Sequence, residues 1–167
     1  MSIKVYRCRD NVILPKYQTL HSACFDIHVN LEDLTEVESY NDHNMTQPLR
    51  VEGGILSIPP RFRVKIPTGL KFDIPTGYSV RLHPRSSMAY KRGLVLSNQE
   101  AVIDSDFVDE VQLLIYNWSS ATVRIHNQER VAQGELVHSY GGYVEEVSTA
   151  PIRVGNRVGG IGSTGSI

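Results

Sequence analysis

The chain consists largely of short runs of β-branched and aromatic residues, and turn residues separate one run from the next. No long window shows apolar residues at the sustained three-to-four spacing of an amphipathic helix. Many short strands at near-regular spacing are typical of an all-β sandwich, jelly roll or barrel. We therefore predict strands over 61–66, 70–74, 78–82, 111–118, 122–126 and 136–140.

Two near-copies of one turn flank the run at 70–74. Pro67-Thr68-Gly69 and Pro75-Thr76-Gly77 differ in position by eight residues. Proline fixes φ early in a turn, and glycine accepts a positive φ at its end. We predict a tight turn at each copy rather than a repeat architecture.

One short helix is predicted over 85–93. Ser86 and Ser87 stand at its start, Lys91 and Arg92 in its last turn, and Gly93 at its stop. Serine is a favoured cap for free backbone amides, and cations suit the negative end of the helix dipole. We therefore expect serine capping at the start of this helix.

Two segments interrupt the strand pattern. Residues 30–54 are polar, acidic and irregular, which predicts a surface loop, an insertion or an added hairpin. From Ser148 the chain is rich in Gly, Ser and Thr, and taken alone this composition is typical of a disordered terminus. We predict one domain over 1–150, carrying the insertion at 30–54, and a flexible Gly-rich arm over 151–167.

Composition narrows the class of protein. The chain has 167 residues, of which 41% are hydrophobic and 21% are charged, as in a single folded domain. A net charge of -1 argues against nucleic acid as a partner. The longest apolar run is far below the ~20 residues of a membrane span, and the first ten residues lack a secretory signal. With only Cys8 and Cys24 and no disulfide framework, we expect a soluble, cytoplasmic (intracellular) protein with free thiols.

Two segments have a composition that suits an anion. The tail from Gly159 to Gly165 holds four glycines and two hydroxyls, and Arg157 stands close by. Glycines let backbone amides approach a phosphate, although a solvated tail is the alternative. Arg85, Ser86 and Ser87 form either a phosphate site or a plain capped helix start, and the two interpretations are compatible.

Acidic residues offer a third candidate chemistry. Asp104 and Asp106 lie two apart, so in a strand both would point to one face and could hold a metal through water or activate a water. An Asp-rich turn is the alternative. Asp26 is a lone acid among apolar residues, for which a buried structural role is the alternative. The six histidines lack paired spacing, so zinc is not expected, and no Gly-x-Ser-x-Gly elbow supports serine hydrolase chemistry.

Taken in order, these segments resemble the trimeric all-β dUTPases, which hydrolyse dUTP to dUMP and pyrophosphate. Five short motifs of that family appear in sequence, from Leu14 to Gly165, and so over nearly the whole chain. The resemblance implies a distorted jelly roll or β-barrel of the β-clip type with one short helix. It also implies a homotrimer with a swapped C-terminal arm that uses Mg²⁺. The matching segments are 14–17 with 22–27, 84–93, 102–107, 129–133 and 159–165.

The resemblance also assigns roles to residues. Asp104 corresponds to the general base that holds the water attacking the α-phosphate, and Asp26 to the acid that orders Mg²⁺ through water. Phe107 corresponds to the ring under the deoxyribose, where a 2′-hydroxyl would not fit. The phosphate contacts correspond to Arg85, Ser86, Ser87 and Gln133, the uracil-reading hairpin to Asn98, Ala101 and Ile103, and the nucleotide-covering arm to Arg157, Ile161, Gly162, Ser163 and Thr164.

The implied activity limits uracil incorporation into DNA and supplies dUMP for dTTP synthesis. Its partners would be dUTP, dUMP, pyrophosphate and other copies of the chain, with neither nucleic acid nor a membrane. The chain departs from the family where Phe107 lacks the hydroxyl of a tyrosine, where Ile161 replaces a stacking ring, and where Arg157 falls one step late. Other functions stay open: a dCTP deaminase on the same fold, where a glutamate would replace Asp104, a nucleotide-sensing or partner-binding trimer, or a structural trimer without a ligand.

Overall fold

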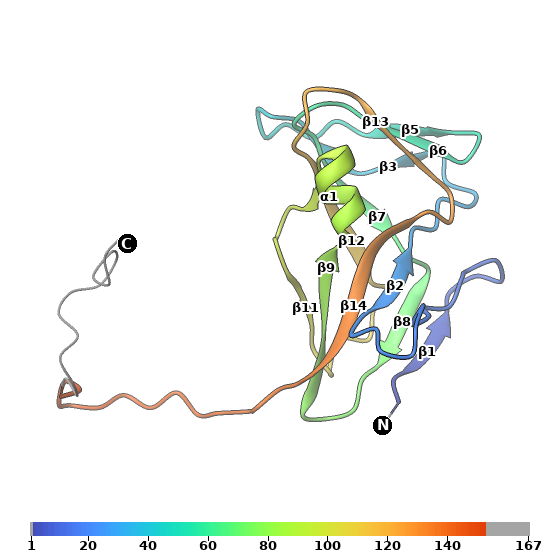
Figure 1. The fold of residues 1–167 in the computed structure, drawn as a ribbon. Coiled ribbons are helices and arrows are strands. Elements are labelled where there is room, and N and C mark those ends of the chain that lie inside the picture. The colour runs from blue at the N-terminus through green and yellow to red at the C-terminus, as the bar shows by residue number, and fades with distance from the viewer. Residues whose placement is uncertain (1, 153–167) are drawn as a thin grey trace.

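The computed structural model describes residues 2–152, which form a β-rich body and a C-terminal extended segment (Figure 1). Within this range the fold contains one helix, α1 (Ser86–Arg92), and all strand pairs are antiparallel. The all-β prediction with one short helix is therefore confirmed. No helix within residues 2–152 is long and apolar enough to cross a bilayer.

Strands far apart in sequence pair within each sheet of the described body. Three sheets have four strands and one has two. In spatial order, the first sheet contains β10 (Leu94–Leu96), β12 (Gln112–Asn117), β7 (Arg63–Pro67) and β4 (Ser39–Tyr40). The second sheet contains β11 (Ala101–Ile103), β9 (Tyr78–Pro84), β14 (Arg130–His138) and β2 (Phe25–His28). The third sheet contains β13 (Val123–His126), β6 (Ile55–Ile58), β5 (Leu49–Glu52) and β3 (Glu36–Val37), and the two-stranded sheet pairs β1 (Lys4–Arg7) with β8 (Leu70–Asp73).

The core lies between the sheets and follows the alternation of each strand. In β2, for example, Phe25 and Ile27 turn into the core, and the intervening Asp26 turns to the opposite face. The central strands supply aliphatic side chains that burial removes from water, which is the main favourable term in folding. The most buried of these are Ile27, Leu31, Leu56, Ile58, Ile66, Leu70, Leu82, Leu94, Leu113, Ile115 and Ile125.

Both predicted turns end on a glycine with positive φ. Gly69 has φ 73° and Gly77 has φ 84°, as the Pro-Thr-Gly pattern predicts. The first turn joins β7 to β8 and the second precedes β9. The repeated tripeptide is therefore repeated turn chemistry, and the two copies differ only in their surroundings.

The helix ends as predicted but begins differently. Gly93 (φ 65°) caps the C-terminus, and its N–H donates to the carbonyl of Ala89 at 3.1 Å. Arg85 occupies the N-cap with an extended backbone and makes no side-chain capping bond. The expectation of serine capping is wrong, because β9 runs to Pro84 and leaves one extended residue before Ser86, which is already helical.

Residues 30–54 contribute to the sheets instead of forming only a surface loop. The strands β3, β4 and β5 lie in this segment, and β5 pairs with β6 as a hairpin. Val37 on β3 and Val51 on β5 are buried in the core, and Leu31 is buried in the connection before β3. Of the alternatives predicted for this segment, the structure therefore agrees with the added hairpin and not with a surface loop alone.

The last strand is longer at its start than the pattern indicates. β14 begins at Arg130 and ends at His138, whereas the alternation predicted a strand over 136–140. The backbone of Ser139 still binds Gly77, with its N–H 2.7 Å from the carbonyl oxygen. Residues 140–152 then extend away from the body, and Tyr143 and Val144 are fully exposed (Figure 1).

Candidate functional site

The outer face of the second sheet carries a row of polar side chains. Gln133 on β14 stands opposite Asp26 on β2 and opposite His83 on β9. Directly opposed residues in antiparallel strands point to the same face, so these three side chains share the outer face. The neighbouring row, which contains Phe25 and Leu82, faces the core.

Asp26 is a buried carboxylate held between two arginines. Its Oδ1 lies 3.0 Å from Nε of Arg85, and its Oδ2 lies 3.0 Å from Nη1 of Arg130. The Asp26 side chain is only 8% exposed, so the two charged contacts are needed to offset its desolvation. Arg85 and Arg130 are therefore fixed in place by one acid, and the structural interpretation of Asp26 holds for this arrangement.

Two further bonds connect this group to the backbone. Arg85 donates from Nη1 to the carbonyl of Arg130 at 3.2 Å, and Gln133 donates from Nε2 to the carbonyl of Pro84 at 3.2 Å. We call Asp26, Arg85, Arg130 and Gln133 the Asp26 cluster. With two guanidinium groups and one carboxylate, the cluster has a net positive charge, which suits an anionic ligand.

Ser86 and Ser87 lie beside the cluster at the start of α1. Ser86 is exposed and Ser87 is half-buried. Neither hydroxyl makes a hydrogen bond within residues 2–152, because Arg85 takes the N-cap position. Both hydroxyls can therefore donate to a ligand placed next to Arg85.

Burial shifts the pKa of one histidine and one cysteine near the cluster toward the uncharged form. Burial lowers the pKa of His28; Asp26 opposes this shift, and Arg130 and Arg85 add to it. Burial also raises the pKa of the Cys24 thiol, with smaller contributions from Glu135 and Asp26. A protonated thiol is a poor nucleophile, so the surroundings of Cys24 give no support to thiol catalysis.

The other predicted site residues lie on β11 and the segments beside it. β11 is an edge strand within the described body, and it pairs with β9 only. Ala101 and Ile103 point into the core, so their backbones rather than their side chains are available on this strand. An edge strand leaves part of its N–H and C=O groups outside the ladder, where they can bind a ligand. Asn98 lies just before β11, in the exposed connection from β10.

Asp104 follows β11 directly and begins a turn. The N–H of Phe107 donates to the carbonyl of Asp104 at 3.1 Å. Asp104 and Asp106 are thus in a turn, and the strand geometry that would point both to one face does not apply. Both carboxylates are exposed, and the Phe107 ring is 38% exposed.

The two groups of predicted site residues lie at opposite ends of β9. Ile103 pairs with Val80 near one end, and Arg85 follows Pro84 at the other end. Asp104 and Arg85 are therefore separated by six strand positions, or about 20 Å at ~3.3 Å per residue. One chain does not bring Asp104 and the Asp26 cluster together, so a site that uses both requires a second copy.

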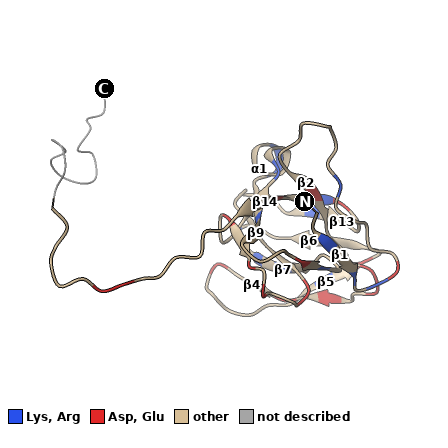
Figure 2. Cartoon of the chain, turned by 90° about the horizontal axis from the view of Figure 1, so that it is seen from below, with Lys and Arg blue, Asp and Glu red and all other residues tan. Residues whose placement is uncertain are grey.

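Five of the predicted site residues lie beyond the part of the chain that the structure describes. Their predicted roles remain predictions; the five are Arg157, Ile161, Gly162, Ser163 and Thr164. The segment that leads toward them is described as far as residue 152. Figure 2 shows acidic colour and no basic colour on that segment, consistent with Glu145 and Glu146, while both signs alternate over the body.

Sequence reasoning missed Arg130. This residue is in the fourth matched segment, 129–133, where only Gln133 received a role. Its contact with Asp26 spans 104 positions, so no local pattern reveals it. The available signal was the single basic residue of that segment, set beside an acid that needs a charged partner when buried.

The donor set limits what metal could bind here. Within residues 2–152, no group of three or more His, Cys, Asp or Glu side chains is arranged to hold a metal ion. Each Asp26 oxygen accepts one arginine bond, and a carboxylate has about four lone-pair positions in total. Asp26 can therefore still accept a water, which fits an ion that arrives with a ligand rather than one enclosed by protein.

Comparisons with known proteins agree on one family. A sequence model of the dUTPase family matches residues 54–165. The deoxyuridine 5′-triphosphate nucleotidohydrolase of Nautilia profundicola is 33% identical over 168 residues, which cover 99% of this chain and 99% of the relative. The relative of the same name from Bdellovibrio bacteriovorus is 33% identical and covers 91% of this chain and 87% of its own length.

Solved structures share the fold. The dUTPase from Streptococcus mutans superposes with a TM-score of 0.65 at 25% identity, over 86% of this chain and 100% of that one. The Staphylococcus bacteriophage 80alpha dUTPase with dUPNHPP gives a TM-score of 0.76 at 19% identity, over 98% of each chain. The dUTPase-like fold predicted from the ordered motifs is therefore confirmed.

Proposed function

The chain belongs to the dUTPase family and hydrolyses dUTP to dUMP and pyrophosphate. We propose that the catalytic site for this reaction is shared between copies of the chain. The observation that carries the proposal is the separation of about 20 Å between Asp104 and Arg85 along β9. Asp104 of one copy would face the Asp26 cluster of another. The predicted homotrimer provides such an arrangement three times.

Asp104 is proposed as the general base. Its carboxylate is exposed at the end of β11, where it can accept a proton from a water beside the α-phosphate. Attack of that water forms the new P–O bond of dUMP, and the bond to the β-phosphate breaks, so pyrophosphate leaves. The nearby ring of Phe107 would pack under the deoxyribose and disfavour a 2′-hydroxyl.

The uracil base is proposed to bind the β10–β11 loop, which we define as residues 97–100, and the edge of β11. Asn98 offers an amide, and the backbones of Ala101 and Ile103 offer N–H and C=O groups at the sheet edge. Uracil presents an acceptor where cytosine presents a donor. An amide directed at that position would reject cytosine, because both donors would be left unpaired.

The phosphates are proposed to bind the Asp26 cluster and the start of α1. Arg85, Ser86, Ser87 and Gln133 provide charged and polar donors on one face, and Asp26 holds Arg85 in orientation. Fixed donors cost little reorganisation when charge moves onto the leaving pyrophosphate. The roles of Arg157, Ile161, Gly162, Ser163 and Thr164 in covering the nucleotide belong to the same proposal.

Enzymes of this family use divalent metal ions, and we propose Mg²⁺ for this chain. Mg²⁺ keeps several waters and binds proteins through one or two carboxylates together with substrate phosphates. Asp26 would hold it through water, by the lone pairs that Arg85 and Arg130 leave free. When bound, the ion would neutralise charge on the phosphate oxygens.

The extended segment supports an assembly. Tyr143 and Val144 are fully exposed on a single copy, and apolar side chains gain free energy when a neighbour covers them. We propose that the arm reaches another subunit, as the resemblance implies. We also propose a cytoplasmic location, because Cys8 and Cys24 are both free thiols, as in a reducing compartment.

A substrate panel tests the proposed function. The protein is incubated with dUTP, dCTP or UTP and Mg²⁺, and pyrophosphate and ammonia are measured. The proposal predicts pyrophosphate from dUTP, little product from UTP, and no ammonia. Ammonia from dCTP would instead support a deaminase, and tight dUTP binding without product would support a nucleotide sensor. Chelation with EDTA should remove turnover, and Mg²⁺ should restore it.

A further inference from the structure

We infer that Glu100 and Arg81 are positioning residues that hold the β10–β11 loop in the shape that reads the base. The inference rests on the proposed function, because it assigns the loop to substrate. It adds two residues outside the five matched motifs. Without these two residues, the far end of the loop has only local backbone bonds.

The β10–β11 loop crosses from one sheet to another with few contacts of its own. β10 pairs with β12 in the first sheet, and β11 pairs with β9 in the second. All four loop residues are exposed, and Gln99 has a positive φ of 63°. Ser97 holds the near end of the loop, because its N–H and its hydroxyl donate to the carbonyl of Leu114 on β12 at 2.8 and 3.3 Å. Beyond Ser97 the backbone bonds are local, from Gln99 N–H to Leu96 at 3.0 Å and from Glu100 N–H to Asn98 at 2.7 Å.

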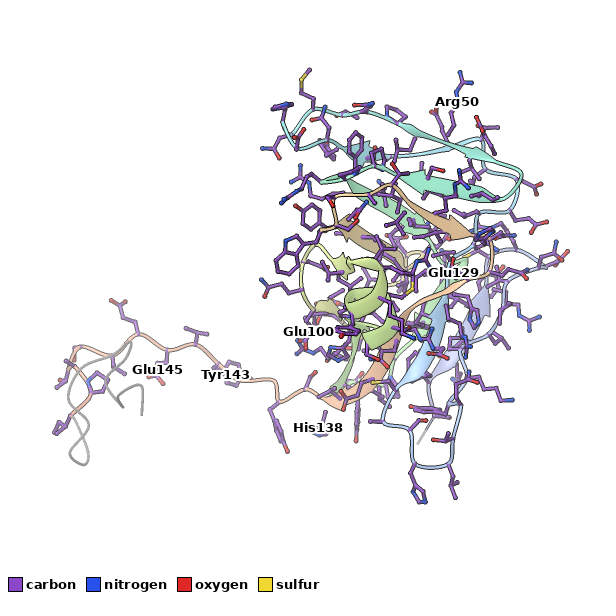
Figure 3. All side chains as sticks on the ribbon, turned by 45° about the horizontal axis from the view of Figure 1, so that its top comes forward. Arg50, Glu100, Glu129, His138, Tyr143 and Glu145 are labelled. Carbon is purple, nitrogen blue, oxygen red and sulfur yellow. The ribbon has the colours of Figure 1, made fainter. Side chains whose placement is uncertain are left out.

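Glu100 connects the far end of the loop to the sheet. Its Oε1 accepts a bond from Nη1 of Arg81 at 3.0 Å, and its Oε2 lies 3.7 Å from Nδ1 of His83. Both partners are on β9, the strand that pairs with β11. Figure 3 labels Glu100 on the folded body, well away from the extended segment that carries Tyr143 and Glu145.

The neighbouring contacts make this connection a small network. His83 also lies 3.6 Å from Glu135 through its Nε2, so its ring stands between two glutamates. Val102, between Ala101 and Ile103, pairs with Arg81 in the ladder. The Arg81 side chain therefore stands over the strand whose backbone is proposed to bind the base, and a bond from it to Glu100 restrains the loop directly.

The expected effect is on substrate binding rather than on chemistry. A loop that must order when dUTP binds loses conformational entropy at that moment, which weakens binding. Asp104 is beyond the other end of β11, so the proton transfer step should be unchanged. A partly exposed pair of this kind contributes modestly, so loss of the contact should raise KM for dUTP about three- to fivefold.

The test uses Glu100→Ala, Arg81→Ala and the charge swap Arg81→Glu with Glu100→Arg in the full chain. Steady-state kinetics with dUTP and dCTP, and the melting temperature, are measured for each. We expect KM for dUTP to rise about three- to fivefold in both single variants, with kcat within about twofold of the wild type. The swap should recover only part of the lost affinity, because the glutamate introduced at position 81 also stands opposite Glu135 on β14. The preference for dUTP over dCTP should fall with the single variants.

Lys4→Ala is the matched control, because Lys4 and Asp73 form an exposed ion pair at 3.2 Å on the β1–β8 sheet. An unchanged KM in Glu100→Ala, or an equal change in Lys4→Ala, would overturn the inference and leave the proposed function intact. A fall in kcat and melting temperature together would overturn it by showing a general structural role. A wild-type chain that turns over no dUTP would overturn both.

Discussion

Asp104 and Arg85 lie at opposite ends of strand β9, six strand positions apart, in a single copy of the chain. Arg85 is held there by Asp26 at 3.0 Å, so its guanidinium group is fixed at that end of the sheet. The proposed general base and the proposed phosphate-binding residues can therefore come together only between two copies of the chain.

Mixing two inactive variants should restore activity. Asp104→Asn and Arg85→Ala each damage every site in a pure assembly. The two chains are unfolded and refolded together in equal amounts. In a random cyclic assembly, about one quarter of the sites should then combine an intact Asp104 from one chain with an intact Arg85 from the other. dUTP turnover of the refolded mixture is compared with that of each variant refolded alone. Absence of any recovery would contradict a shared site.

Asp104→Asn alone should reduce kcat by about 10²–10⁴-fold, which is the usual contribution of a general base. The substitution keeps the volume of the side chain but removes the proton acceptor, so the affinity for a non-hydrolysable dUTP analogue should be largely kept. Pyrophosphate release gives the rate and calorimetry gives the affinity. Asp106→Asn is the control, since Asp106 lies in the same exposed turn. Full turnover in Asp104→Asn would refute the assignment.

Asp26→Asn should destabilise the fold, because it leaves two guanidinium groups around a neutral amide. We expect a loss of roughly 2–3 kcal/mol in the free energy of unfolding. This loss is smaller than is usual when one partner of a buried ion pair is removed, because both arginines are partly exposed. Urea denaturation measures the loss. Asp73→Asn breaks only the exposed pair with Lys4 and should cost under about 1 kcal/mol. Equal effects of the two substitutions would show that the buried carboxylate is not structural.

The two Pro-Thr-Gly turns should respond differently to alanine. A Cβ on Gly77 would meet nothing within 4 Å, so Gly77→Ala should cost only the left-handed backbone penalty of about 1–2 kcal/mol. A Cβ on Gly69 would lie 2.3 Å from Cγ2 of Val12, which adds about 1–3 kcal/mol of overpacking. Denaturant midpoints compare the two. Val12→Ala in the Gly69→Ala background should recover part of the extra loss, and no recovery would rule out the clash.

His28 should make the fold sensitive to acid. Burial lowers the pKa of His28 in the folded chain, so the unfolded chain binds more protons between that lowered pKa and the ordinary value of 6.5. Stability from the neutral imidazole is complete above pH 6.5 and is lost as the pH falls through this window. His28→Gln should flatten the decrease of the unfolding free energy between pH 7.5 and 5.5. An identical decrease in the variant would assign it to other groups.

The local chemistry of the chain predicts much of the fold. The Pro-Thr-Gly turns and the Gly93 stop depend on backbone geometry that a few adjacent residues determine, and the structure has all three. The predictions of serine capping and of a last strand that begins at residue 136 were wrong, because pairing with neighbouring strands determines where the helix and the strand begin. Residues 130–135 belong to β14 through pairing with β2 and β9, which lie far away in sequence.

Short sequence motifs predict less of the candidate site than of the fold. Ordered motifs identified Asp26, Arg85 and Gln133, and the structure brings these three together on one face. The motifs gave no distance between Asp104 and that face. The connection from Arg81 to Glu100 crosses between strands and matches no motif, so it needed the strand register.

A chain with its acid at one end of a strand and its arginines at the other serves two neighbours at once. A copy that had lost both Asp104 and Arg85 but still assembled would impair two sites, one with each neighbour, whereas a copy that had lost only one of these residues would impair a single site. In an equal mixture of intact chains and chains that lack both residues, only about one quarter of the sites would keep Asp104 and Arg85 together, so the doubly defective chain would act as a dominant inhibitor.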